Sequence, residues 1–292
     1  MSLAEVSHYT VRLFSTSKYD GLQTSVFHVR KGAMDAAKML DLSAQSTYQH
    51  NMFLTSNGEC YWVRCFSRTT EIAVPPLWAI SAAPLVSGGS NKRDQPVHIV
   101  AGNKDTIELP DPSSRGHIHR AVLPVDTPYM QSAESLVHER IVLTNILGWQ
   151  AQRRQTHVQV DYVQRTMVIY HSKMTTQALQ ALAPTHASLT PFSVDQLRID
   201  TVVVCVPHKS TGGLFVRAFL PMQAYAEALM PVQATPCLRH PWAPVAVQSV
   251  FEISWVFADR QCRLIKRVLP QTADKMELLA GAEATLERTI YV

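Results

Sequence analysis

The chain has 292 residues, which is enough for one large domain or for two domains of ordinary size. Apolar residues make up 46% of the chain and charged residues 17%, so it can bury a core and does not have the composition of a disordered protein. It contains no apolar run of about eighteen residues, and we therefore expect no transmembrane helix and no membrane partner.

The formal net charge of +4 is spread along the chain, with Arg153-Arg154 and Lys266-Arg267 as the notable basic pairs. This pattern favours a solvated surface over a nucleic-acid groove. The cysteines show no CxxC spacing, which argues against a zinc site and a redox pair and favours reduced thiols in an intracellular protein. Residues 11–18 (VRLFSTSK) have a weak transit-peptide character, so cytoplasm and mitochondrion both stay open.

Alternation with a period of two residues dominates the chain and predicts many strands. Apolar residues at helical spacing predict three helices, over 33–40, 133–147 and 176–183. Many strands with few short helices indicate an α+β fold. In chain order, the predicted strands cover residues 8–14, 24–29, 51–55, 60–67, 97–101, 105–109, 157–163, 166–171, 201–206, 214–220, 249–257, 261–268, 275–280 and 283–291.

The sequence also repeats itself. The segment VRCF at 63–66 recurs as VRAF at 216–219, and both copies are followed by a proline and small residues, at 75–83 (PPLWAISAA) and 231–237 (PVQATPC). We infer a duplication with halves over 1–130 and 131–292, in which the end strands cross between the halves. Two such halves would enclose a cleft, and the helix ends facing it would attract anions.

Several segments, in this order and spacing, resemble the phenazine biosynthesis F-like (PhzF-like) isomerases along nearly the whole chain. That resemblance implies a diaminopimelate epimerase-like fold, with two pseudo-symmetric halves, each a curled sheet or barrel around a central helix. It also implies an active site between the halves, and a homodimer. The matching segments are 21–27 (GLQTSVF), 42–45 (LSAQ), 66–81 (FSRTTEIAVPPLWAIS), 217–221 (RAFLP), 229–237 (LMPVQATPC) and Trp242.

The residues that carry the chemistry of the family are replaced at the matching positions. Its acid-base glutamate corresponds to Ala44, its histidine to Leu77, its aspartate to Met230 and its serine to Thr235. Alanine, leucine and methionine cannot transfer a proton, so we assign no catalytic residue at these positions. The resemblance still implies a ligand cleft, and its candidate residues are Gln45, Trp78, Gln233 and Thr235.

Other details also argue against the family's chemistry. Related racemases use a pair of cysteines at positions that hold Pro75 and Met230 here. An anion-binding glycine is replaced by Pro76, which has no N–H to donate. Trp78 would fill much of a small pocket if it points inward. His117 and His119 lack a third ligand and are interpreted as surface residues, so we expect no metal and no cofactor.

We therefore predict a catalytically inactive PhzF-like scaffold or binding protein, acting as a homodimer or as a subunit of a larger complex. The alternative is a diverged isomerase or epimerase of a small carbon acid. Glu71 and Glu227 would then supply a relocated acid-base pair, because they are the carboxylates close in sequence to the two helix entrances. Binding of a small molecule without chemistry lies between these two hypotheses.

Overall fold

The chain forms two compact units in a computed structural model: Met1–Pro124 with Cys262–Val292, called unit 1, and Val125–Gln261, called unit 2. Each unit is described by itself. The structure describes residues 3–14, 21–58, 60–72, 74, 78, 80–86, 97–101, 105–109, 118–124, 130–132, 156–163, 165–184, 199–208, 213–220, 226–228, 250–257, 261–268 and 275–292.

Unit 1 contains a closed ring of eight strands, which pair in the order β1-β2-β3-β4-β6-β7-β8-β17 and back to β1. Closing the ring leaves none of its strands as a free sheet edge along the paired segments. The strands of the ring are β1 (Glu5–Leu13), β2 (Leu22–Lys31), β3 (Asn51–Ser56), β4 (Tyr61–Phe66), β6 (Val97–Ala101), β7 (Asp105–Leu109), β8 (Ile118–Pro124) and β17 (Lys275–Tyr291).

A short helical segment fills the inside of this barrel. It consists of the 3₁₀ helix η1 (Ile80–Ala82) and the helix α3 (Ala83–Val86). Five of its seven residues, including Ile80 and Val86, are buried. η1 contacts β1, β2 and β17, and α3 contacts β17, so the segment packs against strands from both ends of the chain.

The long helix of unit 1, α1 (Ala36–Ala44), joins β2 to β3 and packs against β4. Its first turn is capped by Asp35, whose carboxylate accepts from the backbone N–H of Lys38 at 2.9 Å. Met39 and the rings of Phe27, Phe53 and Phe66 belong to one buried cluster beneath the helix.

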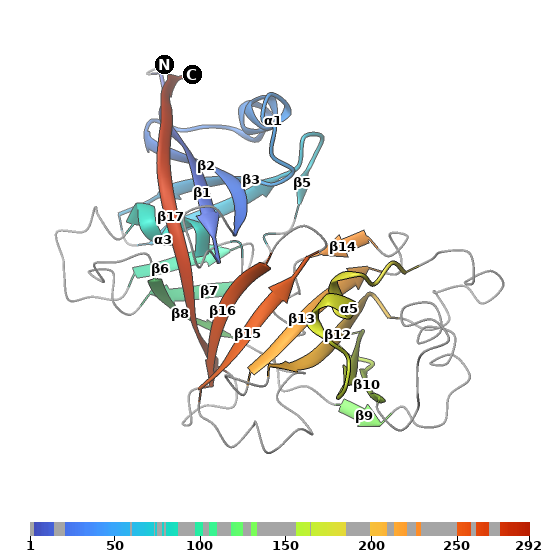
Figure 1. Ribbon diagram of the computed structural model, residues 1–292. Helices are drawn as coiled ribbons and strands as arrows, with labels where there is room; N and C mark the ends of the chain where they lie inside the picture. Colours follow the sequence, from blue (N-terminus) through green and yellow to red (C-terminus); the bar gives the residue numbers. More distant parts are fainter. Residues whose placement is uncertain are drawn as a thin grey trace. The chain divides into compact units, whose positions relative to one another are not determined.

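The two ends of the chain lie side by side in unit 1, as Figure 1 shows. Ala4 and Val292 exchange both backbone hydrogen bonds, at 2.8 and 3.0 Å. β17 pairs with β8 over Lys275–Gly281 and with β1 over Ala282–Tyr291. β16 (Gln261–Val268) adds to β17, and the two-residue β5 (Glu71–Ile72) adds to β4.

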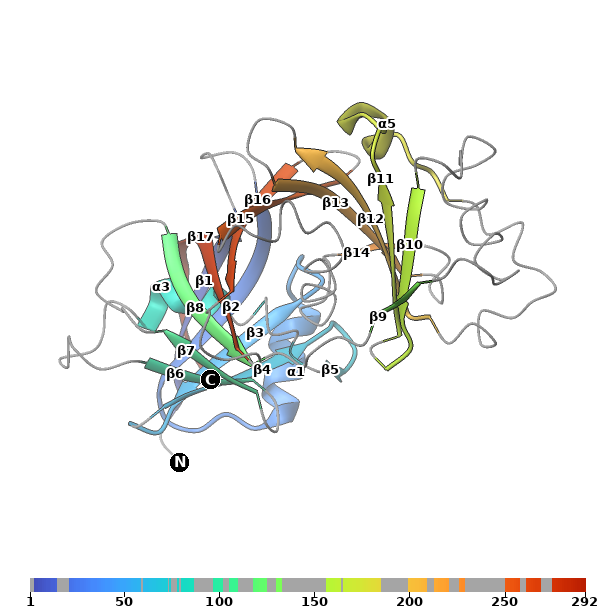
Figure 2. The ribbon, with the colours of Figure 1, turned by 90° about the horizontal axis from the view of Figure 1, so that it is seen from below.

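Unit 2 is a curved sheet with the short helix α5 (Thr176–Gln180) beside it (Figure 2). α5 contacts β12, β13 and β15, and Leu179 is its buried residue. The strands of this sheet are β9 (Met130–Ser132), β10 (Thr156–Asp161), β11 (Thr166–His171), β12 (Thr201–His208), β13 (Gly213–Leu220), β14 (Ala226–Ala228) and β15 (Val250–Val256).

The two units repeat the same order of elements. In unit 1 a helix joins the parallel strands β2 and β3, and in unit 2 a helix joins the parallel strands β11 and β12. β4 then pairs antiparallel with β3 and parallel with β6, as β13 does with β12 and β15. The predicted pseudo-symmetric α+β fold is confirmed by this order.

Most predicted elements are present. Four strands, β6, β7, β11 and β16, have the predicted bounds. The division between 275–280 and 283–291 is wrong, because β17 runs through Gly281, whose carbonyl accepts from the N–H of Phe14 at 2.6 Å. The helix predicted over 176–183 ends at Gln180. The helix predicted over 133–147 lies outside the described residues.

No helix in the described part of the chain is long and apolar enough to cross a membrane.

Replacing Gly213 with alanine is expected to destabilise unit 2 by about 1–3 kcal/mol. A Cβ atom there would clash with the backbone carbonyl oxygen of Glu252, on the neighbouring strand β15. Gly58→Ala provides a comparison in which backbone strain acts without a clash: nothing lies within 4 Å of its Cβ, and its φ of +93° opposes alanine. Urea unfolding measures both variants, and a Gly213→Ala protein as stable as the parent would contradict the close approach.

Candidate functional site

The residue that the motif resemblance matches to the family's acid-base glutamate, Ala44, lies at the end of α1. Ala44 is the last residue of this helix and is exposed, and Gln45 follows as its C-cap. The backbone N–H of Gln45 donates to the carbonyl of Asp41 at 3.4 Å, while its side chain is exposed. Neither side chain has a proton to exchange near neutral pH, so this position offers no acid-base group.

Trp78 packs against a histidine that the sequence interpretation missed. The rings of Trp78 and His50 lie 5.2 Å apart at an angle of 34°, and both side chains are half-buried. His50 precedes β3, and its carbonyl accepts from the hydroxyl of Thr24 at 3.0 Å. Burial lowers the pKa of His50, so its imidazole is neutral at pH 7. The sequence signal that could have identified His50 was its position five residues after Gln45, a candidate residue of the ligand cleft.

Glu71 is held by an arginine of the adjacent strand. Nε and Nη2 of Arg64 donate to its two carboxylate oxygens at 2.7 and 2.6 Å. The hydrogen bonds from Arg64 lower the pKa of Glu71, which keeps the carboxylate ionised at neutral pH. The guanidinium of Arg64 also lies 5.2 Å from the ring centre of Phe66 and donates to the sulfur of Met39 in α1.

Glu227 is held in the same way in unit 2. Nε of Arg217 donates to its carboxylate at 2.7 Å, and the guanidinium lies 4.9 Å from the ring centre of Phe219. Nη1 of Arg217 also donates to three carbonyls at the end of α5, at 2.8, 2.8 and 2.9 Å. These carbonyls belong to Leu179, Gln180 and Leu182.

The two pairs come from the repeated sequence and have the same architecture. Arg64 and Arg217 are the arginines of VRCF and VRAF, and each joins a glutamate, a ring two residues on and the helix of its unit. They differ in burial, since the Arg64 side chain is 39% exposed and that of Arg217 only 4%. In both pairs the carboxylate binds the guanidinium and fixes the position of the arginine side chain.

The remaining candidate residues, Leu77, Met230, Gln233 and Thr235, lie outside the described residues. The structure therefore places Ala44, Gln45, Trp78 and Glu71 in unit 1, and Glu227 in unit 2. Among the residues that it describes, no group of three histidine, cysteine, aspartate or glutamate side chains could hold a metal ion.

Arg217→Met is expected to lower the free energy of unfolding by about 3–5 kcal/mol, because it leaves a partly buried carboxylate and three carbonyls without their donor. Arg64→Met removes the matching arginine from a more exposed pair and is expected to cost about 1 kcal/mol or less. Urea unfolding of the two variants measures the difference. Equal losses would contradict the assignment of Arg217 as the principal anchor of α5.

The buried histidine also predicts a pH dependence. Because the pKa of His50 is lowered in the folded chain, the unfolded chain binds more protons below about pH 6.5, and folding stability falls as the pH drops through that range. His50→Gln should lose part of this acid sensitivity, measured by urea unfolding at about pH 7.5 and 5.5. The rest is expected from other histidines whose pKa is lowered, His8, His28 and His171. An unchanged acid sensitivity would refute the contribution of His50.

Known structures share this architecture over the full length of the chain. A phenazine biosynthesis PhzC/PhzF protein from Clostridium difficile matches with a TM-score of 0.74 at 15% identity, covering 99% of both chains. A PhzF-family protein from Enterococcus faecalis matches with a TM-score of 0.74 at 15% identity over all of both chains. A predicted epimerase from Pseudomonas aeruginosa matches with a TM-score of 0.63 at 14% identity over 98% of both.

At the level of sequence, no family model and no curated protein matches the chain. The likeness to the solved structures, with identities of 14–15%, therefore concerns the fold. Their full coverage agrees with the resemblance seen in the motifs, from residues 21–27 to Trp242. The chain has a PhzF-like fold of the diaminopimelate epimerase type.

Proposed function

We propose that this chain is a PhzF-like pseudoenzyme, a binding scaffold that does not move protons on carbon acids. The observation that carries the proposal is Ala44, which stands exposed at the end of α1 where the family has its acid-base glutamate. Proton transfer needs a group whose pKa lies near the working pH, and its loss typically lowers the rate by about 10²–10⁴-fold.

The carboxylates that could replace this glutamate support the proposal. Glu71 is bound through both oxygens by Arg64, and its lowered pKa makes it a poor proton donor at neutral pH. Glu227 is bound by Arg217, which is itself fixed by three carbonyls of unit 2. Each carboxylate is thus already engaged by an arginine of its own unit.

The contact between Trp78 and His50 bears on both the scaffold and the diverged isomerase. The two rings pack on each other, so part of the surface of each ring is covered by the protein itself. A neutral imidazole is a competent general base in principle. His50 is therefore the residue through which a diverged isomerase would most readily act, and it belongs in the activity test.

For the scaffold role we propose self-association as a homodimer or incorporation into a larger protein assembly. Purification of the tagged chain at native expression level, followed by measurement of the mass of the complex, distinguishes the two. A mass of twice the chain supports the homodimer, and stoichiometric foreign subunits support the assembly. A lone 292-residue chain at working concentration would overturn both forms of the proposal.

Incubation in deuterated water with a panel of amino acids and hydroxy acids tests the absence of chemistry. We expect no enzyme-dependent incorporation of deuterium at carbon, as measured by mass spectrometry, because Ala44 supplies no acid-base group. Glu71→Gln, Glu227→Gln and His50→Gln are run beside the parent. Incorporation by the parent that one of these variants abolishes would establish a diverged isomerase and end the pseudoenzyme proposal.

A further inference from the structure

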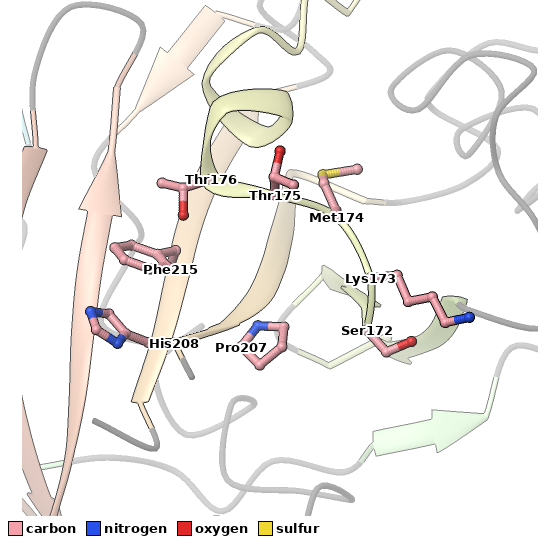
Figure 3. A pocket seen from close by; sticks show the side chains of 8 residues that line it. All are labelled: Ser172, Lys173, Met174, Thr175, Thr176, Pro207, His208 and Phe215. Carbon is pink, nitrogen blue, oxygen red and sulfur yellow. The ribbon is translucent and has the colours of Figure 1, made fainter. Parts of the chain in front are cut away.

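The cavity of unit 2 identifies no class of ligand. Its volume is about 380 Å³, and it lies beside α5 and the ends of β12 and β13 (Figure 3). The ammonium of Lys173 and the hydroxyl of Ser172 point away from the rings of His208 and Phe215, so neither group is held opposite the rings. The surface of unit 1 is more informative, because one of its strands is only half paired.

The second half of β17 has a neighbouring strand on one edge only. In the described part of the chain β17 pairs with β8, β16 and β1, and beyond Gly281 only β1 continues, from Ala282 to Tyr291. This half runs along the near side of unit 1 up to the chain ends in Figure 1. Another strand can add to an open edge of this kind by main-chain hydrogen bonds.

Glu283, Thr285 and Arg288 lie on one face of this half of β17, and all three are exposed. They pair in turn with Arg12, Thr10 and His8, which alternate along β1. The ladder shifts at Glu287, the extra residue of a β-bulge. Counted in ladder pairs, Thr285 is therefore two pairs from Glu283 and also two pairs from Arg288.

The hydrogen bonds to β1 show which backbone groups of β17 face the open edge. The carbonyl of Gly281 accepts from the N–H of Phe14 at 2.6 Å, and Val292 exchanges both bonds with Ala4. In an antiparallel ladder such hydrogen-bonded pairs alternate with pairs whose N–H and C=O groups point the other way. By this alternation, the residues whose backbone groups face the open edge are Ala282, Ala284, Leu286, Thr289 and Tyr291.

We propose that two copies of the chain associate through this edge, with β17 antiparallel to β17 of the second copy about a twofold axis at Thr285. In this register Glu283 of each copy lies opposite Arg288 of the other. Ala284 lies opposite Leu286, and these two residues exchange backbone hydrogen bonds. The inference rests on the homodimer form of the proposed function and names the surface that forms it.

The charges favour a second copy as the partner, in this one register. An axis at Glu283 or at Arg288 would set like charges opposite each other, which is destabilising, and an axis at Ala284 or Leu286 leaves both charges opposite uncharged residues. The axis at Thr285 forms two ion pairs and covers Leu286, whose side chain is 54% exposed in the single chain. Charges and bulges discourage unspecific pairing at an edge, and here they leave one matched arrangement.

Charge reversal tests the register. Glu283→Arg or Arg288→Glu alone sets like charges opposite each other on both sides of the axis and should weaken the dimer about tenfold or more. The double variant restores both ion pairs and should bind within about threefold of the parent. Lys38→Glu, at an exposed lysine of α1, is the matched control and should change nothing. Sedimentation equilibrium measures each dissociation constant, and thermal melting confirms that each variant is folded.

A cysteine at the axis tests the same geometry by a gain of signal. Thr285→Cys brings two thiols together in a pair without hydrogen bonds, with Cα atoms about 4.5 Å apart, which a disulfide can span. Oxidised glutathione should convert this variant to a covalent dimer on non-reducing gels, against the parent as baseline. Thr289→Cys would lie about 20 Å from its own copy and is the matched control.

The outcomes separate this surface from the dimer itself. A parent dimer that is unaffected by both charge reversals, or that crosslinks through Thr289→Cys and not through Thr285→Cys, would overturn the surface and leave the homodimer in place. A parent that stays monomeric up to about 200 µM would overturn the surface and the homodimer together. Neither outcome bears on proton transfer, which the deuterium experiment tests separately.

Discussion

The C-terminal strand β17 is the constraint on which unit 1 depends. Its first half pairs with β8 and β16, and its second half pairs with β1, so a single strand joins the beginning, the middle and the end of the chain. Removing it would open the barrel at β1 and β8 and expose the buried segment η1–α3. The closed ring thus makes the N-terminal half of the sequence dependent on the seventeen residues of β17.

Within this framework the repeated arginines show how the two copies diverged. Arg217 is buried and ties α5, β13 and Glu227 together, whereas Arg64 makes the corresponding contacts near the surface of unit 1. A buried guanidinium needs all of its partners, because an unpaired buried charge is strongly destabilising. The glutamates are therefore understood as parts of the framework of their units.

Much of the fold could be predicted because strand alternation is a local signal. It failed for β8, whose buried residues include His119 and Ala121, so that no apolar stripe marks it. The interpretation of His119 as a surface residue is wrong, because its side chain is only 5% exposed. The candidate site was harder to predict. The repeat VRCF and VRAF identified both arginines, but their glutamates lie seven and ten residues further on. Nothing in the sequence joins His50 to Trp78, which meet through folding alone.

The central claim is that Glu71 and Glu227 are held as ion-pair partners of arginine, and that the lowered pKa of Glu71 makes it unsuited to act as an acid. Carbon-13 NMR of the Glu71 carboxyl, assigned by its loss in Glu71→Gln, measures this property directly as the pH is varied. A pKa below the ordinary range of a glutamate is predicted, because Arg64 binds both oxygens of the ionised form. A pKa raised toward neutrality, as general acids require, would contradict the account.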